Sequence, residues 1–204
     1  HKPSFGGKLP IDKDGYRAAY NETLSMAAEV RERFEITVGV VLGPHPVAWE
    51  HQIADLGMER ASELHLEAVH LALKHIEAGD AQCLGEVGRP HYTVSDETWV
   101  AANENLAEIM AAAAGSGAPI QLHVEDAGAQ TYAEIATMAN SVGLPLSHTI
   151  RHYAPADVSA DFTHGLACTV SVGRGSVEAL VASHASASSP WGMETDFLDD
   201  NRRP

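Results

Sequence analysis

The sequence predicts an α/β fold built on a parallel sheet, and two observations lead to this prediction. Six short apolar runs alternate with longer stretches whose apolar residues recur at helical spacing. Strict alternation of this kind is typical of repeated βα units with parallel strands. A barrel and a doubly wound open sheet share the pattern. However, no Gly-x-Gly-x-x-Gly motif opens a helix and no P-loop is present, which counts against a nucleotide-binding doubly wound sheet.

The strands are predicted from short runs rich in apolar and β-branched residues. EITVGVVLGPHP is almost continuously apolar and ends in Gly-Pro, as expected of a strand that is buried on both faces. AQCLGEVG, PIQLHVE and LACTVSVG have the same character. We expect six strands, at residues 35–44, 81–88, 119–125, 146–153, 166–173 and 191–196.

Five helices are predicted around these strands from apolar periodicity and from their end signals. Gly79 can serve as the C-cap of the helix at residues 59–78, and Ser95, followed by acidic residues, opens the helix at residues 95–117. The other helices are expected at residues 13–33, 127–143 and 174–185, with a short helix or loop at residues 154–165.

The length of the chain limits how complete a barrel it can form. A full eight-fold barrel usually takes about 250 residues and rarely fewer than about 200. With 204 residues, we expect a single domain that forms a short or incomplete barrel. The sequence starts without Met and without the apolar stretch of a signal peptide, which leaves open that it is a slice of a longer protein.

The composition is strongly acidic, with a formal net charge of −15. Such a surface repels phosphates, so tight non-specific binding to DNA or RNA is not expected at low salt. The same composition is expected of proteins kept soluble in concentrated salt. We therefore interpret the acidity as a sign of a halophilic source rather than of a partner.

Membrane and disulfide signals are both missing from the sequence. No apolar run approaches the roughly 20 residues that cross a bilayer, so we expect no membrane partner. Cys83 and Cys168 lie far apart in strand-like runs, and we interpret them as buried free thiols. Free thiols fit the reducing cytoplasm, where we expect the protein.

Residues that can bind metal stand at the ends of the predicted strands. His45 follows VVLGP, and Glu86, His123, His152 and Asp196 each end a later apolar run. The carboxyl ends of barrel strands meet at one face of the molecule, so we expect these side chains to gather there. Burial of such groups is costly without a partner, and one divalent cation can serve several of them. His, Glu and Asp ligands suit Zn²⁺ or Mn²⁺, and the carboxylates also suit Mg²⁺.

A hydrogen-bonded core or surface residue is the simpler interpretation for any one of the histidines. The histidines within predicted helices, and three more beside them, are interpreted in this way: His51, His65, His70, His75, His148, His164 and His184. For Glu86, His123, His152 and Asp196 taken together, coincidence is a much weaker explanation, and we interpret these four as metal ligands.

At these residues the sequence resembles the TatD family of metal-dependent hydrolases, a branch of the amidohydrolase superfamily, and above all its archaeal TatD-related branch. The matching pieces are GPHP at 43–46, GEVG at 85–88, LHVE at 122–125, IRHY at 150–153 and METD at 193–196. They follow the family order from its third strand to its eighth. The resemblance implies an α/β (β/α)8 TIM barrel over residues 1–204, incomplete at both ends because it lacks the first strand and the last helix.

The resemblance also implies roles for single residues. Glu86 matches the carboxylate that bridges two metals, and His123 and His152 match the ligands on the fifth and sixth strands. Asp196 matches the aspartate that binds metal and takes the proton of the attacking water, which makes Asp196 and Glu86 the catalytic candidates. His45 matches a position near the substrate pocket. The implied cofactor is a divalent metal, Zn²⁺ first with Mn²⁺ or Mg²⁺ as alternatives, and two ions if a first strand is present.

Two departures from the family pattern leave points open. The family opens with a His-x-His pair on its first strand, and this chain has none. The chain starts with HKPSFGG, which resembles the loop after the second strand, so we expect the natural protein to supply the pair upstream of His1. Second, the family often has an aspartate soon after the fourth-strand glutamate. This chain has Arg89, Pro90, His91 and Tyr92 in that loop, which leaves the substrate preference open.

The leading functional interpretation is a TatD-like phosphodiesterase or deoxyribonuclease that uses metal-activated water on a small-molecule or nucleic-acid phosphoester. Arg89, His91 and Arg151 are candidates for binding an anionic substrate, because Arg forks match phosphate oxygens; salt bridges at the barrel rim are the alternative. The other functions left open are an amidohydrolase or lactonase acting on a small C–N or ester substrate, and a non-catalytic barrel. The open edges of an incomplete barrel favour pairing with another chain, so a homo-oligomer also stays open.

Overall fold

Six parallel strands form one sheet in the computed structural model, which describes residues 9–196. The expected loop at HKPSFGG lies outside the described residues. Each strand pairs in parallel with the strand before it, so the sheet order follows the sequence and the predicted succession of βα units is confirmed. The strands are β1 (Val41–Leu42), β2 (Cys83–Gly88), β3 (Ile120–His123), β4 (Thr149–Ala154), β5 (Ala167–Ser171) and β6 (Trp191–Glu194).

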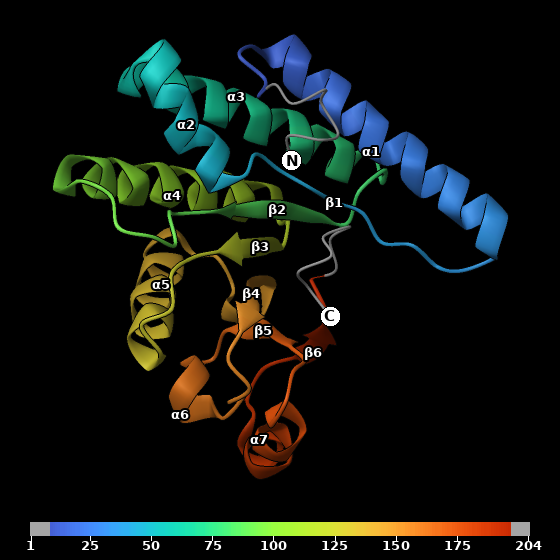
Figure 1. Cartoon of the computed structure of the whole chain (residues 1–204), viewed down its shortest axis with the longest axis vertical. Coiled ribbons are helices and arrows are strands. Elements are labelled where there is room, and N and C mark those ends of the chain that lie inside the picture. Colours follow the sequence, from blue (N-terminus) through green and yellow to red (C-terminus); the bar gives the residue numbers. More distant parts are fainter. Residues whose placement is uncertain (1–8, 197–204) are drawn as a thin grey trace.

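Seven α-helices in this part of the chain lie outside an arc formed by the strands (Figure 1). Within residues 9–196, no pairing joins the two edge strands β1 and β6. The helices are α1 (Lys13–Phe34), α2 (Pro46–Leu56), α3 (Met58–Glu77), α4 (Asp96–Ser116), α5 (Ala129–Val142), α6 (Ala160–Thr163) and α7 (Ser176–Ser183), with short 3-10 turns η1 (Leu146–His148) and η2 (His184–Ser186).

The hydrophobic core lies between the sheet and the helices that cover it. Leu84 of β2, Ile120 of β3 and Val170 of β5 are completely buried. Leu106 and Ile109 of α4 belong to the same core cluster. Because one face of each strand is covered in this way, the other face and the carboxyl ends of the strands are left to form a site.

The helix ends follow the predicted signals. The Ser95 hydroxyl accepts a hydrogen bond from the Thr98 backbone N–H at 3.1 Å and caps α4. At the other end of α4, Gly117 adopts φ +73°, a conformation that glycine reaches without steric cost. Gly79, the predicted cap, lies just beyond the end of α3 with φ +82°.

Three local predictions need correction. The strand expected at 35–44 is reduced to Val41–Leu42, and the helix α2 was not predicted. Pro46 at the first position of α2 needs no backbone donor, and the side chain of His45 caps the helix, so the GPHP sequence starts a helix rather than a loop. The strand expected at 146–153 begins only at Thr149, because residues Leu146–His148 form a 3-10 turn.

Two composition-based predictions can be compared with the structure. Cys83 and Cys168 are both buried and free, as predicted. Among residues 9–196, no helix is long and apolar enough to span a membrane.

Candidate metal centre

Glu86 lies on β2 between two glycines that pack closely against β3. Beside it, a Cβ atom on Gly88 would lie 1.9 Å from the His123 carbonyl oxygen, and one on Gly85 would lie 2.7 Å from Cβ of Gln121. The regular pairing of β2 with β3 shifts between Leu84 and Val87, around the glutamate. The two glycines of the GEVG motif therefore let the strands approach closely enough for the Glu86 carboxylate to reach side chains from both sides.

Three imidazoles surround the Glu86 carboxylate. Its Oε2 lies 3.2 Å from Nδ1 of His123 and 3.4 Å from Nε2 of His45, and its Oε1 lies 3.5 Å from Nε2 of His152. His45 comes from the start of α2, His123 from the end of β3 and His152 from β4. Side chains from three separate βα units thus meet at one carboxylate.

Asp196 joins this cluster from the end of β6. Potential ligand atoms form two groups, and within each group the atoms lie within 4.8 Å of one another: His45 with Glu86 and His123, and Glu86 with His152 and Asp196. Glu86 belongs to both groups. The structure therefore brings together all four residues that the sequence analysis proposes as metal ligands, and it adds His45 beside them.

The donors in this cluster fit a divalent metal. Imidazole nitrogens and carboxylate oxygens are the donors that Zn²⁺ accepts in hydrolase sites, and Mn²⁺ accepts the same combination. The side chain of His152 is 7% exposed and that of Glu86 is 26% exposed, so these donors are partly withdrawn from water. Glu86, His123, His152 and Asp196 are the residues that could hold such an ion.

The imidazoles and carboxylates of the cluster shift one another's pKa values. Burial raises the pKa of Glu86, but hydrogen bonds to His123 and His45 outweigh that effect and hold the pKa well below its usual value. Burial lowers the pKa of His152, and the hydrogen bond to Glu194 and the charge of Glu86 reverse this, so its pKa is raised. Burial is the main reason why the pKa of His45 is lowered. Glu86 is therefore a persistent anion.

Each of the two central imidazoles has a second partner on its far side. Nδ1 of His152 lies 2.9 Å from Oε2 of Glu194, and Nε2 of His123 lies 2.7 Å from Nδ1 of His91. Sequence reasoning proposed His91 but missed Glu194. The signal for Glu194 was that a second carboxylate stands beside Asp196 in the METD sequence, at the end of a predicted strand.

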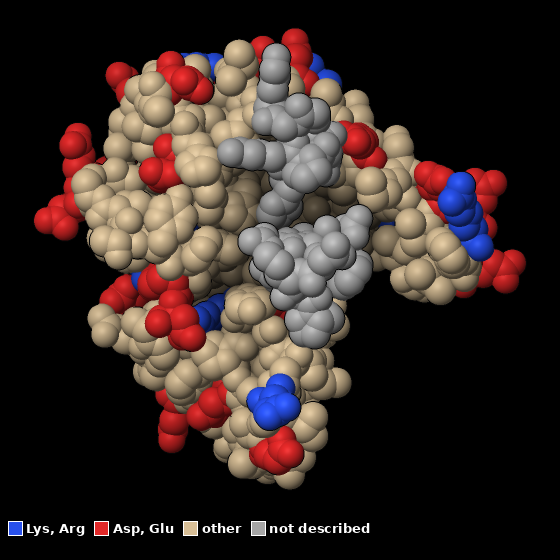
Figure 2. All heavy atoms as spheres, in the orientation of Figure 1, with Lys and Arg blue, Asp and Glu red and all other residues tan. Residues whose placement is uncertain are grey.

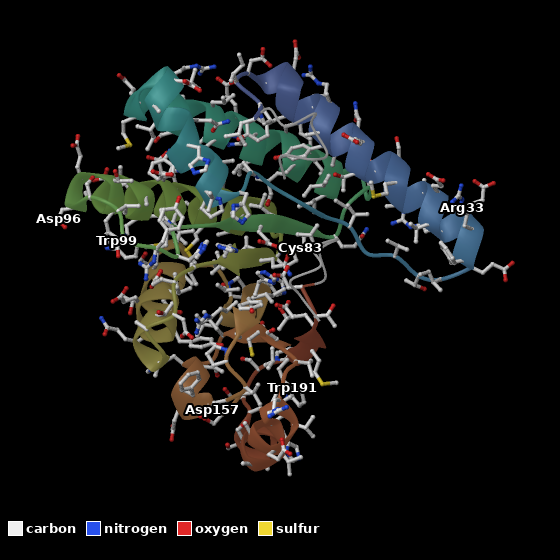
Figure 3. The ribbon with its side chains drawn as sticks, viewed as in Figure 1. Arg33, Cys83, Asp96, Trp99, Asp157 and Trp191 are labelled. Carbon is white, nitrogen blue, oxygen red and sulfur yellow. The ribbon has the colours of Figure 1, made fainter. Side chains whose placement is uncertain are left out.

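Arg89, proposed for substrate binding, lies away from the imidazoles in a network of its own. Its guanidinium forms hydrogen bonds with Glu125 at 2.7 Å, with Glu134 at 2.8 Å and with Asn103 at 2.6 Å. It also stacks over the ring of Trp99, 4.6 Å from the centroid; Trp99 is labelled in Figure 3. These contacts connect α4 and α5 to the segments after β2 and β3, so a role of Arg89 towards substrate stays a prediction.

Arg151 is also held by neighbouring groups. It donates to Asp126 at 3.0 Å and lies over the Tyr132 ring, 4.7 Å from the centroid. Its side chain is only 3% exposed. A cavity of about 540 Å³ lies beside it, lined among others by His91, His152 and Asp196. The cavity gives the candidate metal centre an approach from solvent, and a role of Arg151 towards a ligand in it stays a prediction.

A parallel α/β sheet with clustered imidazoles and carboxylates at its strand ends defines the class of metal-dependent hydrolases built on a (β/α) barrel. The profile of the family described as TatD related DNase matches residues 14–202. The chain therefore belongs to this family, whose fold is a (β/α)8 barrel. Residues 9–196 form six parallel strands of this fold class, which is the class that the sequence predicted. Over 206 aligned positions it is also 29% identical to the uncharacterized protein MJ1127 of Methanocaldococcus jannaschii, covering 100% of this chain and 69% of that protein.

Proposed function

We propose that the protein is a metal-dependent phosphodiesterase of the TatD type, with deoxyribonuclease activity as the leading form of that function. One observation carries the proposal: the Glu86 carboxylate belongs to both groups of ligand atoms at the strand ends. A carboxylate shared in this way is suited to bridging two divalent ions, because each of its oxygens faces a different group. Zn²⁺ is the first candidate for the native metal, with Mn²⁺ and Mg²⁺ as alternatives.

In this proposal Glu86, His123, His152 and Asp196 hold the metal. Bound divalent ions supply Lewis acidity and lower the pKa of water to about 7, which makes hydroxide available near neutral pH. Asp196 accepts the proton of the attacking water and returns it to the leaving oxygen.

His45 is proposed to contact the substrate rather than the metal. Its Nδ1 accepts a hydrogen bond from the Val47 backbone N–H at 3.2 Å, as part of the cap of α2. In the neutral ring the proton must then be on Nε2, which points into the cluster towards Glu86. A ring in this tautomer donates from Nε2, to Glu86 in the structure as it stands and to an anionic substrate that enters the cluster. His91, exposed at the other side of His123, is proposed as a second substrate contact.

Replacing Asp196 with Asn tests the proton transfer. The amide keeps the shape of the carboxylate but cannot accept the proton, so Asp196→Asn is expected to lower turnover by about 10²–10⁴-fold and to retain part of the bound metal. Metal content is measured by mass spectrometry, and hydrolysis of bis(p-nitrophenyl) phosphate gives the rate. Asp55→Asn, an exposed change on α2, is the control. Full activity of Asp196→Asn would remove the proton-transfer role.

The substrate class is tested with the wild-type protein during a zinc titration. We expect hydrolysis of the phosphodiester and of single-stranded DNA to rise with bound zinc. Hydrolysis confined to a lactone or an amide would instead support the amidohydrolase or lactonase alternative. Failure to retain any metal, together with no hydrolysis, would support a non-catalytic barrel.

A further inference from the structure

We propose that Glu194 is a positioning residue that fixes the ring orientation and the tautomer of His152, so that Nε2 of this histidine is available to a metal ion. The proposal rests on the metal site of the proposed function and assigns a role to a residue outside its ligands. Glu194 is the last residue of β6, whereas His152 lies on β4, two strands away in the sheet.

Both oxygens of the Glu194 carboxylate are engaged. Oε2 lies 2.9 Å from Nδ1 of His152, and Oε1 accepts a hydrogen bond from the Tyr153 backbone N–H at 2.7 Å. The side chain of Glu194 is 15% exposed and that of His152 is 7% exposed, so water competes little for these bonds. With both oxygens used by adjacent residues of β4, the carboxylate has little freedom to rotate.

The position of the proton on His152 follows from this contact. A carboxylate only accepts hydrogen bonds, so Nδ1 must carry the hydrogen. In the neutral ring, Nε2 then has the free lone pair, and Nε2 is the nitrogen that faces Glu86 at 3.5 Å. Ligating imidazoles in metalloproteins usually donate their other N–H to such a partner, which fixes the tautomer and raises the basicity of the ligand.

His45 shows that distance to Glu86 alone does not decide which histidine can ligate. Its Nε2 lies 3.4 Å from Glu86, about as close as Nε2 of His152. However, its Nδ1 accepts a hydrogen bond from the Val47 backbone N–H, which leaves the proton on Nε2 in the neutral ring. The partner of Nδ1 is therefore what separates a potential ligand from a hydrogen-bond donor, and for His152 that partner is Glu194.

Replacing Glu194 with Gln tests the assignment with almost no change in shape. The amide has one accepting oxygen and one NH₂ group, so it cannot accept from both His152 and Tyr153. If its NH₂ group faces Nδ1, the ring must move its proton to Nε2 and lose the lone pair needed by the metal. We expect Glu194→Gln to weaken zinc binding by about 10–100-fold, measured by competition with a chromophoric chelator. Glu178→Gln, an exposed change on α7, is expected to bind zinc as the wild type does.

A second measurement separates positioning from a general loss of structure. In the zinc-loaded wild-type protein, ¹⁵N-correlated NMR of the His152 ring is expected to show a proton on Nδ1 and none on Nε2. A proton on Nε2, or zinc affinity of Glu194→Gln within twofold of the wild type, would overturn the proposal. If the variant does not fold, the wild-type spectrum still decides. Absence of zinc binding by the wild type would overturn the proposed function as well, and is thereby distinguished from failure of the Glu194 role alone.

Discussion

At the scale of single residues, the candidate site depends on how closely β2 and β3 approach each other. Gly88 adopts φ +153°, and a Cβ atom there would lie 1.9 Å from the His123 carbonyl oxygen. The same stretch of β3 carries the His123 imidazole that faces Glu86. A side chain at position 88 would therefore push apart the two strands that present a carboxylate and an imidazole to each other.

Gly88→Ala is accordingly expected to lower the free energy of unfolding by on the order of 3 kcal/mol, because backbone atoms must move to relieve the contact. Gly115→Ala is the matched control: Gly115 lies within α4, and an added Cβ meets nothing within 4 Å. That change is expected to raise stability by about 0.5–1 kcal/mol, since alanine favours the helix. Urea denaturation measures both. Equal effects of the two changes would contradict the close-approach argument.

At the scale of secondary-structure elements, α3 contains an unusual buried group. His65 lies in the core-facing side of α3 and is completely buried. Neither of its ring nitrogens has a hydrogen-bond partner among the residues that the structure describes. Burial is the main cause that lowers the pKa of His65 to about 3. The helix thus packs well only while this imidazole stays neutral.

The consequence is a pH-dependent stability that one substitution should remove. The folded-state pKa of His65 lies below the value of about 6.5 for an unfolded chain, so protonation favours unfolding. The loss of folding stability caused by this protonation is absent above pH 6.5 and grows as the pH falls towards 3. Between pH 7 and pH 5 the wild type is expected to lose about 2 kcal/mol more than His65→Leu.

Urea unfolding at the two pH values measures this difference, with His70→Leu as the control, because His70 is exposed on the same helix. His65→Leu is also expected to be the more stable protein at pH 7, by about 1–3 kcal/mol, since it no longer buries two unpaired nitrogens. An unchanged pH profile in His65→Leu would show that other groups govern acid unfolding.

The elements also show what a sequence can and cannot predict. The strands β2 to β6 were predicted to within a few residues, because strands that are covered by helices have short apolar sequences. The helix α2 was missed because its start depends on His45 acting as a cap. The strand β1 was predicted too long, because only two residues of its apolar run pair with β2.

The residues of the candidate site were predictable from the sequence, but the partners around them were not. Strand-end positions indicated Glu86, His123, His152 and Asp196, since parallel strands bring their carboxyl ends together. The ion pairs of Arg89 with Glu125 and Glu134 join segments far apart in the sequence, so no local sequence pattern predicts them. The contact of His152 with Glu194 joins β4 to β6 and could only be found in three dimensions.

At the scale of the whole molecule, negative charge dominates. The chain carries 28 acidic and 13 basic residues. Figure 2 shows acidic side chains spread over the outer helices, with few basic ones between them. Repulsion among like charges opposes the compact state and is weakened by salt, whose screening length falls from about 10 Å at 0.1 M to about 3 Å at 1 M.

Stability is therefore expected to rise with salt. Between 0.1 M and 2 M KCl we expect a gain of about 1–2 kcal/mol, or roughly 3–8 °C in Tm, measured by thermal unfolding followed by circular dichroism. NaCl is the control, because screening should act alike for both salts. A Tm that falls as KCl rises would contradict the view that charge repulsion limits stability.

The strictly sequential order of the sheet has a consequence for how the protein is made. Within residues 9–196, each strand from β2 to β6 pairs with the one synthesised just before it, so a chain leaving the ribosome can add these βα units one at a time. The proposed ligands emerge in the order Glu86, His123, His152 and Asp196. The candidate site is therefore complete only once Asp196, the last of the four, has been synthesised and β6 has joined the sheet.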